Sequence, residues 1–177
     1  ISLGIMFRAN EESEIKSKRL KAAWSNKRTN AIKNNKPLTN TCPTWLRVNK
    51  DRTKYDVIED KAKIIRNIFD MCINNFGILS IANHLNDNKT PTLNGSKYWY
   101  YSYIAKILNN RSVFGEYQLH YTENGKRIKY GDPIKNYFPV IVSEEQFNLS
   151  QAQIQLRSNA RGRKGATFTN ILSGMIY

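Results

Sequence analysis

The segment Leu79–Gly115, LSIANHLNDNKTPTLNGSKYWYYSYIAKILNNRSVFG, decides the fold because it predicts two short amphipathic helices joined by a turn. Apolar residues recur at helical spacing in both halves: Ile81, Ala82 and Leu85, then Tyr100, Ile104, Ile107 and Leu108. The residues between them that favour turns are Thr90, Pro91, Asn94, Gly95 and Ser96. This pattern fits a helix-turn-helix, and it equally fits a packed helix pair in any small α domain.

In a helix-turn-helix, the amino-terminal residues of the second helix reach base edges in the major groove of DNA. The candidates for DNA contact at this end are Tyr100, Ser102, Tyr103 and Lys106. Helical spacing assigns Trp99, Ile104, Ile107 and Leu108 to the core. Tyr100 and Tyr103 fit either side, because a tyrosine can pack its ring or present its hydroxyl.

The chain is strongly basic, with 177 residues, 28 Lys and Arg, 14 Asp and Glu, and a formal net charge of +14. This excess favours a polyanionic partner, either nucleic acid or an anionic membrane surface. We expect no membrane association, because the sequence has no apolar run of about 18 residues and ISLGIMF is too short for a signal peptide. Cys42 and Cys72 lack a C-x-x-C partner, which gives a disulfide framework no support and predicts a reducing, cytoplasmic location.

The polar region from Asn10 to about Asn35 contains no Pro or Gly and predicts one long helix. Its acids, Glu11, Glu12 and Glu14, should complement the helix dipole, and Glu12–Lys16 and Glu14–Lys18 have the spacing of ion pairs. No acid follows until after Lys36, so the basic run is either a solvated face or a phosphate-binding surface. Because this helix buries little surface of its own, we expect Lys27–Asn35 to fray without DNA.

The remaining patterns predict a mainly helical α+β fold. Asp60–Asn74 has an apolar helical face of Ile64, Ile65, Ile68, Phe69 and Cys72, and Thr44–Val48 is strand-like with Trp45 as a core anchor. Asn124-Gly125 predicts a hairpin between Glu116–Leu119 and Arg127–Tyr130, whose basic tip, Lys126, Arg127 and Lys129, either contacts a phosphate or is solvated. Ser143–Gln146 forms a capping box for a following helix, and Arg157–Lys164 predicts a basic linker.

Several of these motifs together resemble the recombinase DNA-binding domain of the large serine recombinases, the integrases and transposases of phages and mobile elements. They are Ile64–Phe69, then Ile81-Ala82-Asn83-His84-Leu85-Asn86, then Trp99, and finally Ile107-Leu108-Asn109-Asn110-Arg111 with Val113 and Gly115. Glu12, Ser17 and Arg19 are similar to the family's E-x-x-x-x-S-x-R helix. Cys42-Pro43-Thr44-Trp45-Leu46 departs from the Pro-Tyr-Gly-Tyr that many members have nearby.

The resemblance implies three regions. Residues 1–36 would be the long carboxy-terminal helix of an absent resolvase-type catalytic domain, residues 37–156 the DNA-binding domain, and residues 157–177 a linker and the start of a truncated zinc ribbon. The chain begins at Ile1 and stops at Tyr177 within an apolar run, so we interpret it as part of a longer protein. The resemblance therefore implies no metal or cofactor site in this chain, and zinc would belong only to the part downstream.

The resemblance also implies the function. The intact protein would be a prokaryotic, nucleoid-associated recombinase that acts as a dimer and tetramer and cuts double-stranded attachment-site DNA through phosphoserine links. This chain lacks the Tyr-x-Arg-x-Ser setting of the nucleophile, so no catalytic residue is assigned and we expect it to be inactive alone. Two alternatives stay open, a freestanding helix-turn-helix regulator and a basic RNA-associated structural protein.

The resemblance and the charge pattern together add DNA-contact candidates outside the helix pair. They are Lys16, Arg19, Lys27, Arg28 and Lys36 in the long helix, Arg111 after the pair, and Arg161, Arg163 and Lys164 in the linker.

Overall fold

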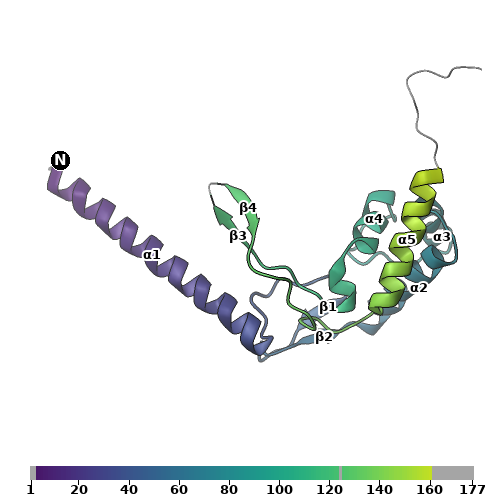
Figure 1. Ribbon diagram of the computed structural model, residues 1–177, viewed down its shortest axis with the longest axis horizontal. Helices are drawn as coiled ribbons and strands as arrows, with labels where there is room; N and C mark the ends of the chain where they lie inside the picture. Colours follow the sequence, from purple (N-terminus) through teal and green to yellow (C-terminus); the bar gives the residue numbers. More distant parts are fainter. Residues whose placement is uncertain (1–2, 124, 161–177) are drawn as a thin grey trace, which may run out of the picture.

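The computed structural model describes residues 3–123 and 125–160, and over these residues the fold is mixed α+β, as the sequence predicts (Figure 1). The helices are α1 (Leu3–Asn34), α2 (Glu59–Ile73), α3 (Ile78–Asp87), α4 (Tyr101–Leu108) and α5 (Glu144–Ala160), with a 3-10 helix, η1 (Arg111–Phe114). The strands are β1 (Leu46–Val48), β2 (Tyr55–Val57), β3 (His120–Glu123) and β4 (Lys126–Lys129), which form two antiparallel hairpins.

The first helix, α1, projects away from the rest of the protein as a long rod (Figure 1). It begins at Leu3, well before the expected start near Asn10, so its first turn contains no acid. The prediction that Glu11, Glu12 and Glu14 complement the helix dipole is therefore wrong, because that interaction fades beyond the first turn. The expected Glu12–Lys16 ion pair is present at 3.6 Å, whereas Glu14–Lys18 is not among the ion pairs of the described residues.

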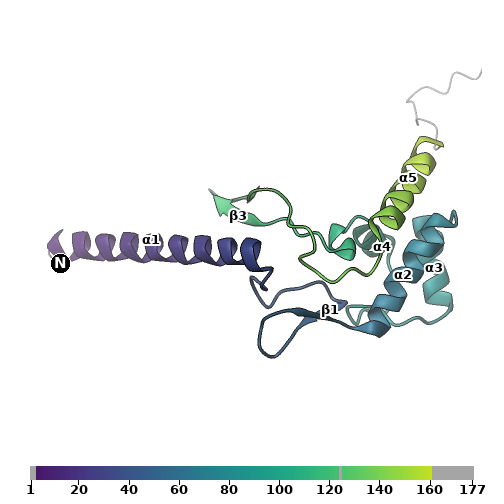
Figure 2. The same ribbon diagram turned by 60° about the horizontal axis from the view of Figure 1, so that its bottom comes forward.

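The core lies among the four helices at the other end of the molecule (Figure 2). Ile65, Ile68, Phe69 and Cys72 of α2 are completely buried, as their helical spacing predicts. Helix α2 packs against α5, where the rings of Phe69 and Phe147 lie 6.1 Å apart, and against α3 and α4. Burial of this apolar face holds α2 in the core, since each large side chain that is buried contributes about 1.5–3 kcal/mol to the free energy of folding.

The β1–β2 hairpin joins α1 to this core, and the sequence patterns did not predict its second strand. Trp45, expected in the core, is 3% exposed. The ring of Tyr55 on β2 lies 5.6 Å from that of Tyr137 and 4.9 Å from that of Phe138. The Tyr137 hydroxyl accepts a hydrogen bond from the Leu38 amide (2.8 Å) and donates one to the Lys36 carbonyl (3.2 Å), so it holds the chain just after α1.

After α4, the chain turns sharply through η1, which the sequence patterns did not predict. The Asn110 side chain caps η1 by accepting a hydrogen bond from the Ser112 amide at 3.0 Å. Gly115 follows with φ of +91°, and a Cβ atom there would lie 2.8 Å from the Phe138 carbonyl oxygen. Only glycine therefore fits, in both conformation and space.

The β3–β4 ladder ends at the pair Glu123–Lys126, where the sequence predicts the turn, but its strands differ from those expected. The ladder begins at His120, paired with Lys129, and Glu116–Leu119 contributes only an isolated bridge between Tyr117 and Ile134. Glu116, which the pattern placed in a strand, is instead buried, and its carboxylate pairs with Arg111 at 2.8 Å.

The last described helix, α5, begins with the predicted capping box. The Ser143 Oγ atom accepts a hydrogen bond from the Gln146 amide (3.1 Å), and Gln146 Oε1 accepts one from the Ser143 amide (3.2 Å). Instead of giving way to a linker at Arg157, α5 continues to Ala160. The remaining linker candidates, Arg161, Arg163 and Lys164, and the expected start of a zinc ribbon lie outside the described residues.

Candidate nucleic-acid interface

The amino-terminal end of α4 rests on a buried tryptophan. Trp99, two residues before the helix, is 2% exposed, and its indole Nε1 donates a hydrogen bond to the Thr90 carbonyl at 2.9 Å. Ile104, Ile107 and Leu108 are also buried, which confirms the core face predicted for this segment. The helix itself begins at Tyr101, so Tyr100 is its N-cap residue and Trp99 is not helical.

Asn86, near the end of α3, fixes the backbone of Trp99 from both sides. Its Oδ1 accepts a hydrogen bond from the Trp99 amide at 2.8 Å, and its Nδ2 donates one to the Trp99 carbonyl at 3.0 Å. The sequence patterns place Asn86 within a motif and predict no role for it. The sequence offers only a weak signal for it, a polar residue directly after the buried Leu85. Asn86 therefore ties the start of α4 to the end of α3.

The connection between α3 and α4 runs from Asn88 to Tyr100 and is ordered by further hydrogen bonds. Lys61 of α2 donates to the Leu93 carbonyl at 2.8 Å, and Thr92 Oγ1 donates to the Ser96 carbonyl at 2.6 Å. This connection is longer than the turn of about three to four residues that is usual in a helix-turn-helix. Leu93 anchors this connection in the core.

The opposite side of α4 is open to solvent. Tyr100 is 59% exposed, and Ser102 and Lys106 are exposed as well. Tyr103 is half-buried, because its ring stacks on Trp99 at 5.7 Å and its hydroxyl lies 3.5 Å from Thr44 Oγ1. Of the four candidates on this helix, three are therefore free to meet a ligand, and Tyr103 is partly committed to packing.

Most of the basic candidates on and just after α1 are also exposed, namely Lys16, Arg19, Lys27 and Lys36. Arg28 differs from them because it is half-buried between α1 and the β3–β4 hairpin. Its guanidinium carbon lies 5.3 Å from the ring centre of Tyr130 and 6.0 Å from that of Trp24, which is cation–π geometry. Arg28 therefore holds the hairpin against α1.

Arg111, the candidate after the helix pair, already has a protein partner. Its Nη2 lies 2.8 Å from a carboxylate oxygen of Glu116, and its guanidinium carbon lies 5.4 Å from the ring centre of Phe114. The Glu116 side chain is only 7% exposed, so losing Arg111 would leave a buried carboxylate without its ion-pair partner. The charge of Arg111 is thus used within the fold.

The two cysteines are placed for packing rather than for reaction. Burial raises the pKa of the Cys72 thiol and outweighs the opposing effect of Arg157, and burial likewise raises the pKa of Cys42. Both thiols are therefore protonated and poorly nucleophilic at neutral pH. Within residues 3–123 and 125–160, no cluster of three or more His, Cys, Asp or Glu could hold a metal ion, and no helix is both long and apolar enough to span a membrane.

Comparisons with known proteins give a consistent result. Residues 59–157 match the family model named Recombinase. The chain is 36% identical over 141 residues to "Uncharacterized protein YbcK" of Escherichia coli (strain K12), covering 79% of this chain and 27% of that protein. It is 30% identical over 107 residues to a "Putative DNA recombinase" of Bacillus subtilis (strain 168), covering 57% of this chain and 21% of that protein.

A solved structure also has a similar fold. It is titled "Crystal Structure of a LSR-DNA Complex", is 22% identical in sequence, and superposes with a TM-score of 0.53. The match covers 80% of this chain and 42% of the other chain. The present chain thus spans less than a third of each of the two curated relatives and less than half of this structure.

Proposed function

Since this chain belongs to the recombinase family, we propose that it is the DNA-binding portion of a site-specific serine recombinase of a mobile element. In this proposal the helix pair α3–α4 acts as a helix-turn-helix variant and places α4 in the major groove of attachment-site DNA. Ser102 and Tyr100 contact base edges there, and Lys106 contacts a phosphate. The family match favours this proposal over the alternative of a freestanding helix-turn-helix regulator.

The long basic helix supplies affinity that does not depend on sequence. From Lys16 to Lys36 the chain has no acid, and Lys16, Arg19, Lys27 and Lys36 are exposed. Such side chains bind DNA by neutralising phosphates and releasing counterions, so they position the protein without reading bases. The observation that carries the proposal is that one chain combines this acid-free, exposed basic surface with helix α4. One face of α4 is fixed in the core beside Trp99, and its other face is exposed.

We further propose that the complete protein cleaves and rejoins DNA as a dimer and tetramer, and that this chain alone does neither. Support comes from the lack of the family's Tyr-x-Arg-x-Ser motif in the sequence and from the small share of the relatives that the chain spans. Covalent attachment of this chain to cleaved DNA would contradict that assignment. Stoichiometric zinc in the purified chain would contradict the proposal that the zinc ribbon lies downstream.

The test is to measure the binding of this chain to mixed-sequence duplex DNA as a function of salt concentration. If about five or six phosphates are neutralised, log K should fall with log salt at a slope near −5, from about −0.9 per contact. A slope near zero would contradict DNA binding by phosphate neutralisation. Competition with double-stranded RNA of the same sequence separates a DNA-binding role from an RNA-binding one, since only the DNA duplex should displace bound DNA efficiently.

A further inference from the structure

The β3–β4 hairpin has two chemically different faces. Directly opposed residues in an antiparallel ladder share a face, and successive residues alternate between faces. The pairs Tyr121–Ile128 and Glu123–Lys126 therefore lie on one face, and the pairs His120–Lys129 and Thr122–Arg127 lie on the other. Because all basic residues of this short hairpin are exposed, the face on which each one lies decides what it can meet.

The first face is turned toward α1. Tyr121 and Glu123 of this face line a cavity of about 550 Å³ together with α1 residues such as Leu20, Lys21 and Trp24. Thr122 also lines this cavity, although its ladder position belongs to the second face. Tyr130, which continues this face beyond β4, has its ring 6.2 Å from that of Tyr121 and lies beneath the Arg28 guanidinium at 5.3 Å. These contacts fix the hairpin beside the carboxyl-terminal half of α1 (Figures 1 and 2).

The second face carries only basic and neutral residues. Arg127 and Lys129 are exposed there, and Arg127 Nη2 lies 3.4 Å from Nδ1 of His120 on the same face. The one acid of the two strands, Glu123, belongs to the first face, opposite Lys126. Among the described residues, no ion pair engages Arg127 or Lys129 with a carboxylate. Two positive charges on this face are thus not neutralised by the protein.

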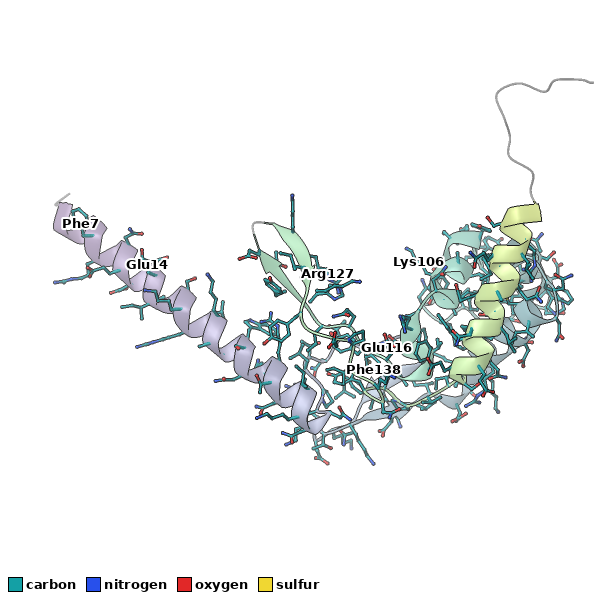
Figure 3. The ribbon with its side chains drawn as sticks, in the orientation of Figure 1. Phe7, Glu14, Lys106, Glu116, Arg127 and Phe138 are labelled. Carbon is teal, nitrogen blue, oxygen red and sulfur yellow. The ribbon has the colours of Figure 1, made fainter. Side chains whose placement is uncertain are left out.

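This second face is directed toward the DNA-reading helix. Figure 3 shows Arg127 on the side of the hairpin that faces α4, and Lys106 on the side of α4 that faces the hairpin. The two basic residues come from elements that pack on different supports, the hairpin on α1 and α4 on the helical core. They nevertheless border the same open side of the molecule.

We propose that Arg127 and Lys129 form a second phosphate-binding surface, which holds the DNA backbone beside the groove that α4 enters. The partner is duplex DNA, whose phosphates give it about one negative charge per 1.7 Å of helix axis. This inference rests on the proposed function, because it adds a contact to the same DNA complex. The surface binds phosphates and not bases, so it adds affinity without changing sequence preference.

The experiment compares Arg127→Ala, Lys129→Ala and Lys126→Ala in the full 177-residue chain. Lys126 is the matched control, since it is an exposed cation on the same hairpin but on the opposite face, across from Glu123. With mixed-sequence duplex DNA, the salt slope should become less negative by about one unit for Arg127→Ala and for Lys129→Ala. Lys126→Ala should keep the slope of the parent.

The outcomes separate this inference from the proposed function. Failure of the parent chain to bind DNA would overturn both. A parent that binds, with Arg127 and Lys129 variants that retain its slope, would overturn the second surface and leave DNA binding intact. Equal changes in all three variants would also overturn it, because net charge and not the face would then decide. Thermal melting of each variant should match the parent, as all three side chains are exposed.

Discussion

Helices α1 and α2 differ in how their sequences stabilise them. Helix α2 has 15 residues and buries six of them in the core, Ala62, Ile65, Ile68, Phe69, Met71 and Cys72. Helix α1 is 32 residues long, and among its residues with described side chains only Ala31 is buried. An isolated helix in water is marginal, so α1 depends on contacts at its carboxyl-terminal end and on its partner. Under the proposed function, α2 therefore serves folding, whereas α1 serves DNA binding and contributes little to the core.

If α2 and α1 divide these roles, substitutions in the core should lower the free energy of unfolding most. Trp99→Ala removes a side chain that is 2% exposed, together with the indole hydrogen bond to Thr90, so the free energy of unfolding should fall by about 3–5 kcal/mol. Urea denaturation followed by circular dichroism measures this loss. Tyr100→Ala, which changes an adjacent side chain that is 59% exposed, is the control and should stay within about 0.5 kcal/mol of the parent.

Arg157 tests whether α5 belongs to the folded core up to its end. Its guanidinium donates hydrogen bonds to the Phe76 carbonyl (2.6 Å), the Cys72 carbonyl (2.7 Å) and Asn75 Oδ1 (3.2 Å), all at the carboxyl-terminal end of α2. Arg157→Ala should lower the free energy of unfolding by about 1.5–3 kcal/mol, through these bonds and the lost cation at a helix terminus. The same denaturation experiment on Leu156→Ala, which alters a side chain that is 62% exposed, should show little change. Equal stability of the two variants would mean that a linker begins at Arg157 in solution.

Asn86 links the core to the proposed reading helix, since it follows the buried Leu85 and hydrogen-bonds the backbone of Trp99 just before α4. Asn86→Ala removes both hydrogen bonds to Trp99 and should cost about 1–2 kcal/mol. Asn86→Asp keeps an acceptor for the Trp99 amide but loses the donor to its carbonyl. Amide exchange measured by NMR should therefore accelerate at Trp99 in Asn86→Ala and remain slow in Asn86→Asp. Asn88→Ala, whose side chain contacts only His84 among the described hydrogen bonds, should leave that amide unchanged.

The smallest effects on folding are expected on α1, and they reverse a prediction made from the sequence. The small surface that this helix is expected to bury predicts that Lys27–Asn35 frays, but Arg28 packs on Tyr130 and Ala31 is buried. We now expect Glu11–Lys21 to exchange its amides faster than Lys27–Ile32 in the absence of DNA, and both to exchange faster than α2. Arg28→Ala should accelerate exchange in Lys27–Ile32, whereas Lys27→Ala should not. Uniform protection of the amides along α1, at the level of α2, would contradict the division of roles between these two helices.

Sequence periodicity predicted the elements that are stabilised by burial. The apolar face of α2, the core positions Trp99, Ile104, Ile107 and Leu108, and the capping box of α5 all follow from local spacing. Strand β2 and helix η1 escaped prediction because they are short and depend on distant partners, such as Tyr137 and Phe138 against Tyr55. Spacing along one segment holds no information about such partners.

The candidate site was predictable to a similar extent. Charge and spacing identified the exposed basic residues of α1 and the open face of α4. They could not show that Arg28 would meet Tyr130 or that Arg111 would pair with Glu116, because both contacts require the hairpin and η1 to be in place. The two hydrogen bonds between Asn86 and the Trp99 backbone could not be predicted for the same reason, since Trp99 lies 13 residues away in the chain.

The most direct test of the central claim is the ratio of affinities for a selected duplex and its scrambled counterpart at fixed salt. The selected duplex comes from enrichment of a randomised library on the parent chain. Ser102→Ala, on the exposed face of α4, should lower this ratio by about 5- to 150-fold, corresponding to about 1–3 kcal/mol for a lost base contact. Arg19→Ala, on α1, should weaken binding to both duplexes equally and leave the ratio unchanged. A ratio that survives Ser102→Ala but changes with Arg19→Ala would show that α1, and not α4, reads the DNA.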